Sequence, residues 1–255
     1  MSESRLAAIS IPTGTPAAIA CVLRDGPRAT NFIPLTGGTF TMGSLARPDE
    51  QPIHEATVGP FAVAFAPVSN AEFAHFIEAT GHEPPRFWDD ERFNAPAQPV
   101  VGVSWFDAND YCAWLSELLA RPCRLPTEAE REFAARGGLE GALYPWGDEP
   151  WTDGTLALGA KGTDRPLVTG SRPHNGYGLY HMGENVHEWC SGWYDPTGYA
   201  GIPLDPTDPD AAPRRASRGG SWRHHVKVTR IAARSALAPG ARYNDYGMRV
   251  YAGLR

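Results

Sequence analysis

The 255-residue sequence has few cysteines, and they are not spaced like metal ligands. Cys21, Cys112, Cys123 and Cys190 form no C-x-x-C pair, so we expect buried free thiols, with a Cys112–Cys123 disulfide as the alternative. The sequence also lacks an apolar run of roughly eighteen residues, the length that spans a bilayer. Its N-terminus has no basic segment followed by an unbroken apolar one. These absences argue against a membrane partner and favour a cytoplasmic location.

The sequence also has fewer basic than acidic residues. The chain has 23 Lys and Arg residues against 29 Asp and Glu residues, which gives a formal net charge of −6 and a pI near 5.7. An acidic balance argues against nucleic acid or an anionic membrane as the main partner. Arginines do gather between Arg214 and Arg234, where we expect a solvated or salt-bridged face.

Glycine, proline and aromatic residues, in contrast, are abundant. The 27 Gly and 24 Pro are spread along the chain without low-complexity runs, which indicates a loop-rich fold held by specific turns. A hydrophobic fraction of 42%, with 8 Trp, 9 Tyr and 10 Phe, supports one large core. We therefore expect an extended lead-in over residues 1–30 and a single domain over residues 31–255.

Three stretches carry helix signals. A capping residue, an apolar stripe and a terminating Gly81 predict a helix over Asn70–Thr80. A second apolar stripe predicts a helix over Asp107–Leu119. A Thr-x-x-Glu capping box, in which Glu130 is the acidic member, opens a third over Thr127–Arg136.

Strand signals are short and scattered. Thr39–Gly43 alternates as a strand, and Ala56–Phe65 reads as two strands bent at Gly-Pro. After residue 144 we expect no helix, only short strands between turns: Leu167–Thr169, Trp189–Tyr194, Ile231–Arg234 and Met248–Tyr251. The prediction is an α+β fold with little regular secondary structure.

Several segments, in order, resemble the sulfatase-modifying-factor family, to which the formylglycine-generating enzymes belong. Together they cover about residues 31–252, and a set in one order is far more specific than one motif. The segments are Phe32–Ser44, Pro67–Phe73, Pro99–Trp105, Arg124–Glu130, Tyr144–Asp148, Asn175–Tyr180, Arg218–Trp222 and Gly247–Val250.

This resemblance implies a C-type-lectin-like fold, often stabilised by bound calcium. In the formylglycine-generating enzymes, copper held by two cysteines oxidises a Cys of a sulfatase with molecular oxygen. Other members of the family are maturation or accessory proteins, and others are binding modules with variable loops.

The sequence departs from that enzyme in the stretch that follows Gly219-Gly220-Ser221. The family's reactive cysteines fall shortly after this motif, whereas Trp222–Arg234 contains none. A copper(I) site of that type needs two soft thiolates close together. We therefore predict that this chain does not generate formylglycine by that mechanism, although Ser221 matches the serine beside the family's oxygen site.

A second departure falls on the family's calcium site. By resemblance the ligands would be His181, the backbone carbonyls of Glu184 and Val186, and the Glu188 carboxylate. Calcium prefers oxygen donors, whereas imidazole suits transition metals. His181, where the family has Asp or Asn, thus predicts either loss of this site or a transition metal in it. The family's other calcium site would need Glu149–Leu167, which is too short to keep it.

The candidate working surface lies near the C-terminus. Ser221, His224 and His225 are its candidate catalytic residues, and Trp222, Arg234 and His187 its candidate ligand-binding residues. We expect Ser221, Trp222, His224 and Arg234 to line one cleft with the segment His187-Glu188. The alternatives are that Trp222 belongs to the core, that Arg234 forms a structural ion pair, or that Ser221, His224 and Glu188 form a hydrolase triad.

Two functional classes follow from this surface. One is an oxidoreductase-type maturation or accessory factor that acts on a peptide or protein partner, for example of a metalloenzyme, with a metal ion (calcium or a transition metal) as possible cofactor. The other is a non-catalytic lectin-type module that binds a ligand on its C-terminal surface.

Overall fold

The computed structural model describes residues 32–149, 164–199 and 213–254. Strands β1 (Phe32–Leu35), β2 (Gly38–Met42), β3 (His54–Val58) and β4 (Phe61–Ala64), with the short 3-10 helix η2 (Pro48–Glu50), precede α2 (Asn70–Thr80) and α3 (Trp105–Leu119). Then follow β5 (Cys123–Arg124), α4 (Glu128–Arg136), β6 (His187–Trp193), β7 (Arg215–Arg218), the 3-10 helix η3 (Val226–Val228), β8 (Arg234–Leu237), β9 (Tyr246–Gly247) and β10 (Tyr251–Ala252).

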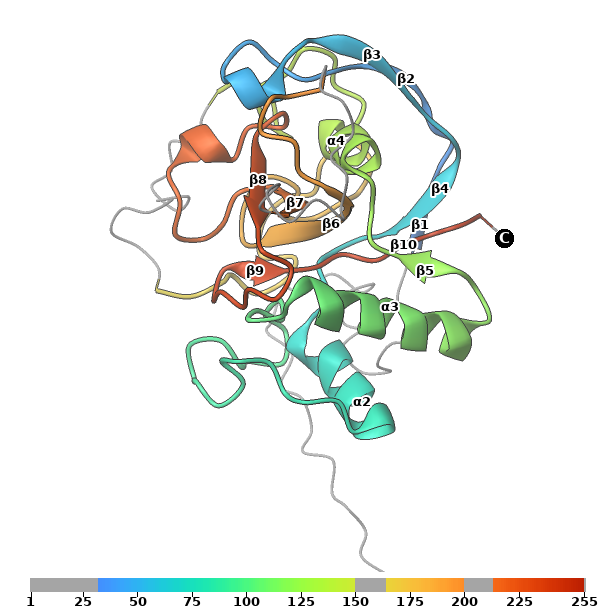
Figure 1. The fold of residues 1–255 in the computed structure, drawn as a ribbon, viewed down its shortest axis with the longest axis vertical. Coiled ribbons are helices and arrows are strands. Elements are labelled where there is room, and N and C mark those ends of the chain that lie inside the picture. Colours follow the sequence, from blue (N-terminus) through green and yellow to red (C-terminus); the bar gives the residue numbers. More distant parts are fainter. Residues whose placement is uncertain (1–31, 150–163, 200–212, 255) are drawn as a thin grey trace, which may run out of the picture.

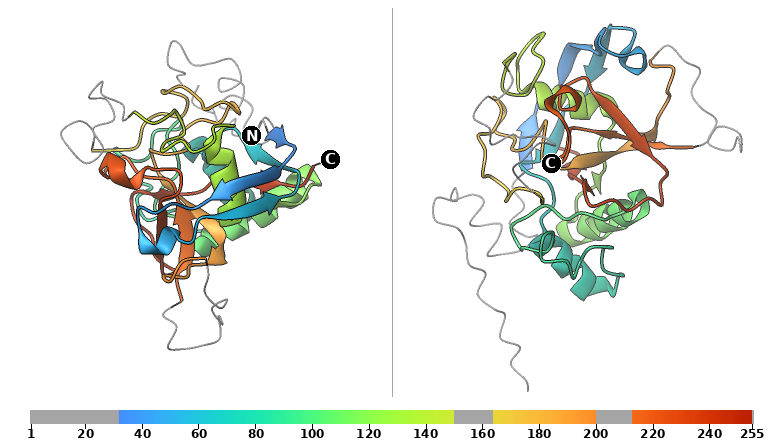
Figure 2. Two further views of the ribbon diagram at one scale, coloured as in Figure 1. Left: turned by 90° about the horizontal axis from the view of Figure 1, so that it is seen from above. Right: turned by 90° about the vertical axis from the view of Figure 1, so that its left-hand side faces the viewer.

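These strands form two four-stranded sheets and one hairpin. One sheet has the order β1-β4-β10-β5, so the first and the last strand of the described chain both pair with β4. The other has the order β8-β7-β6-β9, and the β2–β3 hairpin stands apart from both. In Figures 1 and 2 the hairpin and the α2–α3 pair lie at opposite ends of the molecule, with α4 beside the hairpin. The predicted C-type-lectin-like α+β class is confirmed.

The three helices begin at the capping signals in the sequence. Each has a complete capping box at its cap residue, which is Ser69, Ser104 or Thr127. The hydroxyl of the cap accepts a hydrogen bond from the backbone N–H of the third helical residue, and the carboxylate of that residue accepts one from the backbone N–H of the cap. The first helix matches the predicted bounds. The second begins at Trp105, two residues earlier than predicted, because Asp107 is the third helical residue of its box rather than the cap.

Several strand predictions after residue 144 were wrong. Leu167–Thr169 is irregular, because Thr169 N donates to Ala97 O in a loop (2.9 Å) instead of joining a ladder. Ile231–Arg234 is mostly a turn, and the strand β8 begins only at Arg234. Of Met248–Tyr251 only Tyr251 is in a strand. We also missed β7, since its two arginines suggested exposed surface.

A fully buried ion cluster supports the start of β6. Glu188 lies between Arg131 of α4 (Nε–Oε2, 2.7 Å) and Arg249 (Nη2–Oε1, 2.9 Å), and all three side chains have almost no exposed surface. A buried charge is costly unless it is paired and hydrogen-bonded. Both guanidinium groups also donate to backbone carbonyls, Arg131 to Met182 O and Arg249 to Ala64 O and Tyr180 O. The second residue of β6 is therefore held firmly inside the molecule.

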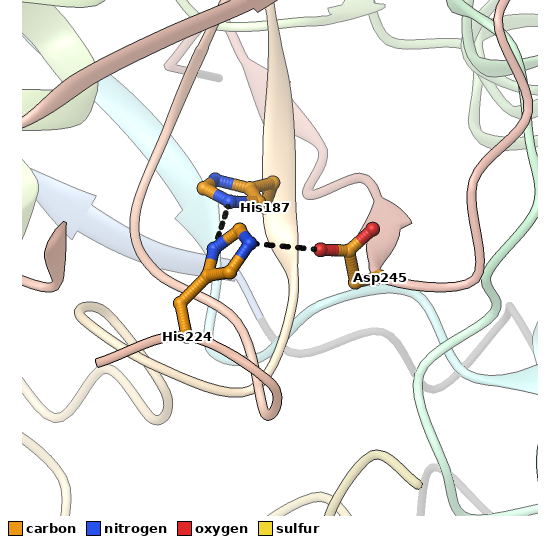
Figure 3. Close-up of side chains that lie close together, drawn as sticks. All are labelled: His187, His224 and Asp245. Atoms are coloured by element: carbon orange, nitrogen blue, oxygen red, sulfur yellow. Dashed lines mark hydrogen bonds and ion pairs between the residues drawn. The ribbon is translucent and has the colours of Figure 1, made fainter. Parts of the chain in front are cut away.

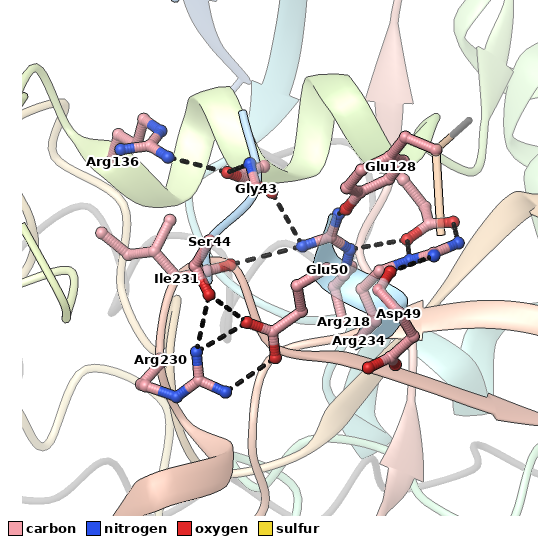
Figure 4. A network of polar contacts seen from close by, with 12 residues as sticks. Gly43, Ser44, Asp49, Glu50, Glu128, Arg136, Arg218, Arg230, Ile231 and Arg234 are labelled. Atoms are coloured by element: carbon pink, nitrogen blue, oxygen red, sulfur yellow. Dashed lines mark hydrogen bonds and ion pairs between the residues drawn. The ribbon is translucent and has the colours of Figure 1, made fainter. Parts of the chain in front are cut away.

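The arginines between 214 and 234 are mostly salt-bridged rather than solvated (Figure 4). Arg218 pairs with Glu128 and Glu132 of α4, and Arg230 makes a two-pronged pair with Glu50. This favours the salt-bridged alternative of the prediction.

The cysteines of the described residues are free and buried, as predicted. Cys112 and Cys123 are not joined by a disulfide, and Cys190 lies inside β6. Cys21 and the lead-in boundary at residue 30 lie outside the described residues. Among the residues that the structure describes, no helix is long and apolar enough to cross a membrane.

Candidate functional site

Strand pairing brings two segments of the chain together at the start of β6. The strands β6 and β9 run parallel, with His187 opposite Tyr246 and Glu188 opposite Gly247. His187 N donates to Asp245 O (2.8 Å). The last residue before β9 is thus fixed beside the first residue of β6.

A third segment arrives through the Gly-Gly-Ser turn that follows β7. Gly219 has a φ of +80°, which favours glycine, and a Cβ on Gly220 would clash with the methyl group of Thr229. Gly220 N donates to Gly183 O and Trp222 N to Asn185 O, which ties the turn to the segment before β6. The turn thereby places Ser221 and His224 next to His187 and Asp245.

His187, His224 and Asp245 form a contiguous polar cluster (Figure 3). His187 Nε2 and His224 Nδ1 are 2.9 Å apart, and His224 Nε2 is 3.6 Å from Asp245 Oδ2. Ser221 Oγ donates to Asp245 Oδ2 (3.0 Å). His187 and Asp245 are buried, whereas the His224 side chain is 37% exposed and forms the cluster's contact with solvent.

Both imidazoles of the cluster are neutral near pH 7. Burial, aided by the neighbouring His224, lowers the pKa of His187 to about 3. Burial also lowers the pKa of His224, and Arg223 adds to this effect, although Asp245 opposes it. A neutral imidazole offers a lone pair, so the cluster presents nitrogen and carboxylate donors rather than positive charge.

Trp222 contacts Val186 and Asn244, the chain neighbours of His187 and Asp245. It is half-buried, packs against Phe93, Val101 and Val186, and its Nε1 donates to Asn244 O (3.1 Å). The indole therefore packs against the core on one side, and the rest of its surface is exposed to solvent. Its predicted place in one cleft with His224 and His187 stays a prediction.

Comparison with known proteins identifies the fold and the family. The family model "Sulfatase-modifying factor enzyme 1-like domain" matches residues 22–253. This chain belongs to that family. It is 33% identical to the formylglycine-generating enzyme of Streptomyces coelicolor, over 88% of this chain and 90% of that protein.

Two further relatives of this sulfatase-modifying-factor domain are informative. The mouse protein named inactive C-alpha-formylglycine-generating enzyme 2 is 32% identical over 86% of this chain and 84% of its own length. Among solved structures, PvdO from Pseudomonas aeruginosa superposes with a TM-score of 0.75 at 29% identity, covering 88% of this chain and 94% of that one. The relatives of this chain therefore include one whose name marks it as inactive in generating formylglycine.

The residues of this sulfatase-modifying-factor domain do not fit the family's two-thiolate copper centre. The segment that follows Gly-Gly-Ser carries His224 and no cysteine. Cys190 is fully buried in β6, and burial raises the pKa of its thiol, which disfavours the thiolate that copper(I) requires. Cys112 and Cys123 belong to the α3–β5 region of the core.

The predicted ligands of a calcium-type site have other partners. Both carboxylate oxygens of Glu188 accept from Arg131 and Arg249. His181 Nε2 accepts from Gly170 N (3.0 Å), and its Nδ1 lies 2.7 Å from Glu184 Oε1. These contacts give His181, Glu184 and Glu188 structural roles and do not support a metal there, while Val186 is buried beside Trp222. The stretch Glu149–Leu167, predicted to lack the second calcium site, lies mostly outside the described residues.

Arg234 does not belong to the cluster of His187, His224 and Asp245. It forms a two-pronged pair with Glu128 (2.8 Å for both bonds), its Nη1 donates to Asp49 O and Asp195 O, and its side chain is 2% exposed (Figure 4). Arg234 therefore forms the structural ion pair that we gave as the alternative. The ligand-binding role assigned to Arg234 is corrected accordingly.

His225, although adjacent to His224, points elsewhere. It is exposed, and its Nδ1 accepts from Lys227 N at the start of η3 (3.2 Å). The hydrolase triad is not formed either, because Ser221 donates to Asp245 rather than to a histidine and Glu188 is held by arginines. Ser221 and His224 thus belong to the site, but not as nucleophile and base.

Sequence reasoning missed Asp245. It stands immediately before β9 and shares no motif with His187 or His224. The one hint in the sequence was that Asp245 lies just before the family-like segment Gly247–Val250. The sequence does not show that this position is next to His187, because that follows from the pairing of β6 with β9.

Proposed function

We propose that this chain is an oxidoreductase-type maturation or accessory factor that acts on a peptide segment of a protein partner, with a metal ion as cofactor. The observation that carries the proposal is the cluster of His187, His224 and Asp245. Its member His224 follows shortly after Gly219-Gly220-Ser221, the motif after which the enzymes that this chain resembles keep their reactive cysteines, and it opens the cluster to solvent. Relatives named for generating formylglycine, a modified protein residue, support a peptide as the substrate class.

Within this proposal, the chain's own residues have distinct tasks. The exposed part of Trp222 offers a flat surface for a peptide backbone or side chain. Ser221 holds the Asp245 carboxylate in place through its hydroxyl group. His224 is the cluster member that a bound peptide would reach first, because His187 and Asp245 are buried behind it.

A non-catalytic binding module is the second candidate. The absence of a cysteine after Gly-Gly-Ser and the similarity to a mouse relative named inactive favour it. Under this candidate the same Trp222–His224 surface holds a partner without changing it.

A photo-crosslinking experiment separates the two candidates. A crosslinking amino acid replaces the exposed Arg223 beside His224, and a matched control carries it at the exposed Glu78 on α2. We expect a partner crosslinked from position 223 and not from position 78. The captured peptide should carry an oxidative mass change in cells with the wild-type gene, and this change should be lost with His224→Ala.

The other outcomes are equally decisive. A partner captured at position 223 with no mass change in either strain would replace the maturation factor with the binding module. Equal capture from both positions, or none, would contradict both candidates.

A further inference from the structure

We infer that His187, His224 and Asp245 bind one divalent transition-metal ion, with Ser221 as the group that orients the carboxylate. This inference deepens the proposed function, on whose metal cofactor it rests, by assigning the site and the class of metal. One ligand atom from each of the three side chains lies within 4.8 Å of the other two. Two imidazoles and one carboxylate are donors that zinc-like ions accept.

The distances are close to those of a metal site. Tetrahedral sites with metal–nitrogen bonds of about 2.0–2.1 Å hold their ligand atoms roughly 3.3 Å apart. His187 Nε2 and His224 Nδ1 are 2.9 Å apart, whereas the 3.6 Å contact with Asp245 Oδ2 runs through the other His224 nitrogen, Nε2. One ion can use only one of these two nitrogens. A rotation of the His224 ring or of the Asp245 side chain would therefore bring the three side chains around an ion in place of the His–His hydrogen bond.

With both imidazoles neutral and no cation present, one ring lone pair of the cluster faces no protein donor in either tautomer. If His224 Nδ1 donates to His187, the His224 Nε2 lone pair faces the Asp245 carboxylate. If His187 Nε2 donates instead, the buried His187 Nδ1 keeps a lone pair without a donor, because the Gly219 backbone beside it favours a proton on this ring rather than supplying one. An unsatisfied buried polar atom is costly, whereas an ion would use the lone pairs that face one another.

The surroundings resemble those of a metal site with an open position. Ser221 Oγ, fully buried, donates to Asp245 and fixes the carboxylate, as outer-shell groups do around metal ligands. Three protein ligands leave a further coordination position for water or a side chain of the partner, reached past the exposed edge of His224. The guanidinium of Arg223 lies 3.9 Å from Asp245 and opposes a second cation, so it should weaken metal binding.

Metal titration of the whole chain tests this inference. Chelator-treated protein is titrated with Co²⁺, followed by its visible absorption, and then with Zn²⁺ in competition. We expect one equivalent to bind, and His224→Ala to weaken binding by at least about 10-fold. The matched control His225→Ala, one residue away and outside the cluster, should bind like the wild type.

Two further variants sharpen the result. Ser221→Ala should weaken binding by roughly 10-fold through the freed carboxylate, and Arg223→Gln should tighten it. Melting temperatures of the metal-free variants report folding, and His224→Ala should leave that temperature nearly unchanged because its side chain is partly exposed.

The inference is overturned if the wild type binds neither metal, if His224→Ala and His225→Ala behave alike, or if Ca²⁺ competes as well as Zn²⁺. Its failure is distinguishable from failure of the proposed function. Metal binding at this cluster without any crosslinked partner would sink the function alone. A partner that is crosslinked and modified by a protein that binds neither Co²⁺ nor Zn²⁺ would sink the metal site and its role as cofactor, but not the action on a peptide partner.

Discussion

At the scale of single residues, neighbours in the sequence have opposite roles. His224 enters the polar cluster, whereas His225 caps a 3-10 helix at the surface. The difference arises from the turn at Gly219-Gly220, which fixes the direction in which the following side chains leave the backbone. A site built on such a turn depends on residues that never touch a ligand.

Gly220→Ala is expected to destabilise the protein by about 1–3 kcal/mol. The added Cβ would lie 2.9 Å from Gly183 O and clash with the buried Thr229 methyl group, neither of which can move freely. Chemical denaturation measures the change. Gly240→Ala is the matched control, since nothing lies within 4 Å of its Cβ position and it should change the free energy of unfolding by less than about 0.5 kcal/mol. Equal effects of the two substitutions would contradict the packing argument.

At the scale of elements, capping boxes define where the helices begin. In α4 the cap also secures the position of Arg131, which lies one turn into the helix and pairs with Glu188 at the start of β6. The cap is therefore linked to the site through one helix and one ion pair.

Thr127→Ala should lower the free energy of unfolding by about 1 kcal/mol. The substitution removes the hydroxyl that accepts from Glu130 N (3.1 Å) and leaves that amide without its cap. Equilibrium denaturation is the measurement, with Glu117→Ala on the exposed side of α3 as the comparison variant, for which less than about 0.5 kcal/mol is expected. A Thr127→Ala protein as stable as wild type would mean that this box adds nothing.

At the scale of the whole molecule, buried ion pairs join α4 to the β8-β7-β6-β9 sheet and to the closing segment. The Glu188 and Glu128 carboxylates each contact two arginines from different elements. Burial alone would raise the pKa values of both carboxyl groups, but the arginines outweigh it and the net shift is downward.

Stability should consequently fall in acid. Below their ordinary pKa of 4.5, these two carboxylates take up protons in the unfolded chain before they do so in the folded one. The stabilisation is fully present above pH 4.5 and is lost as the pH falls through the folded values, at up to about 1.4 kcal/mol per pH unit for each carboxylate. Denaturation midpoints measured between pH 6 and pH 3 test this. A free energy of unfolding that stays constant below pH 4.5 would contradict it.

We also expect no formylglycine from a sulfatase-type Cys peptide incubated with this protein, copper and oxygen. The chain offers no cysteine pair after Gly-Gly-Ser, and Cys190 is buried. Mass spectrometry of the peptide is the measurement, with the Streptomyces coelicolor enzyme as the positive control. Robust turnover would require an oxygen-activating site other than the two-thiolate centre.

The sequence by itself determined the helices, the family and part of the site. Capping boxes and apolar stripes act over a few residues, so Asn70–Thr80 and the start of α4 were predictable. The order of the motifs was enough to identify the family, and the Gly-Gly-Ser motif pointed to the segment that supplies Ser221 and His224 to the cluster.

The tertiary structure alone decided which charged groups reach the site. Asp245 joins it through a parallel pairing of strands nearly sixty residues apart in sequence, whereas Glu188 and Arg234 are drawn away by arginines and carboxylates of α4 and other segments. A charged side chain in a sequence has many possible partners. Only the packed chain, in which every buried charge must be paired, selects one of them.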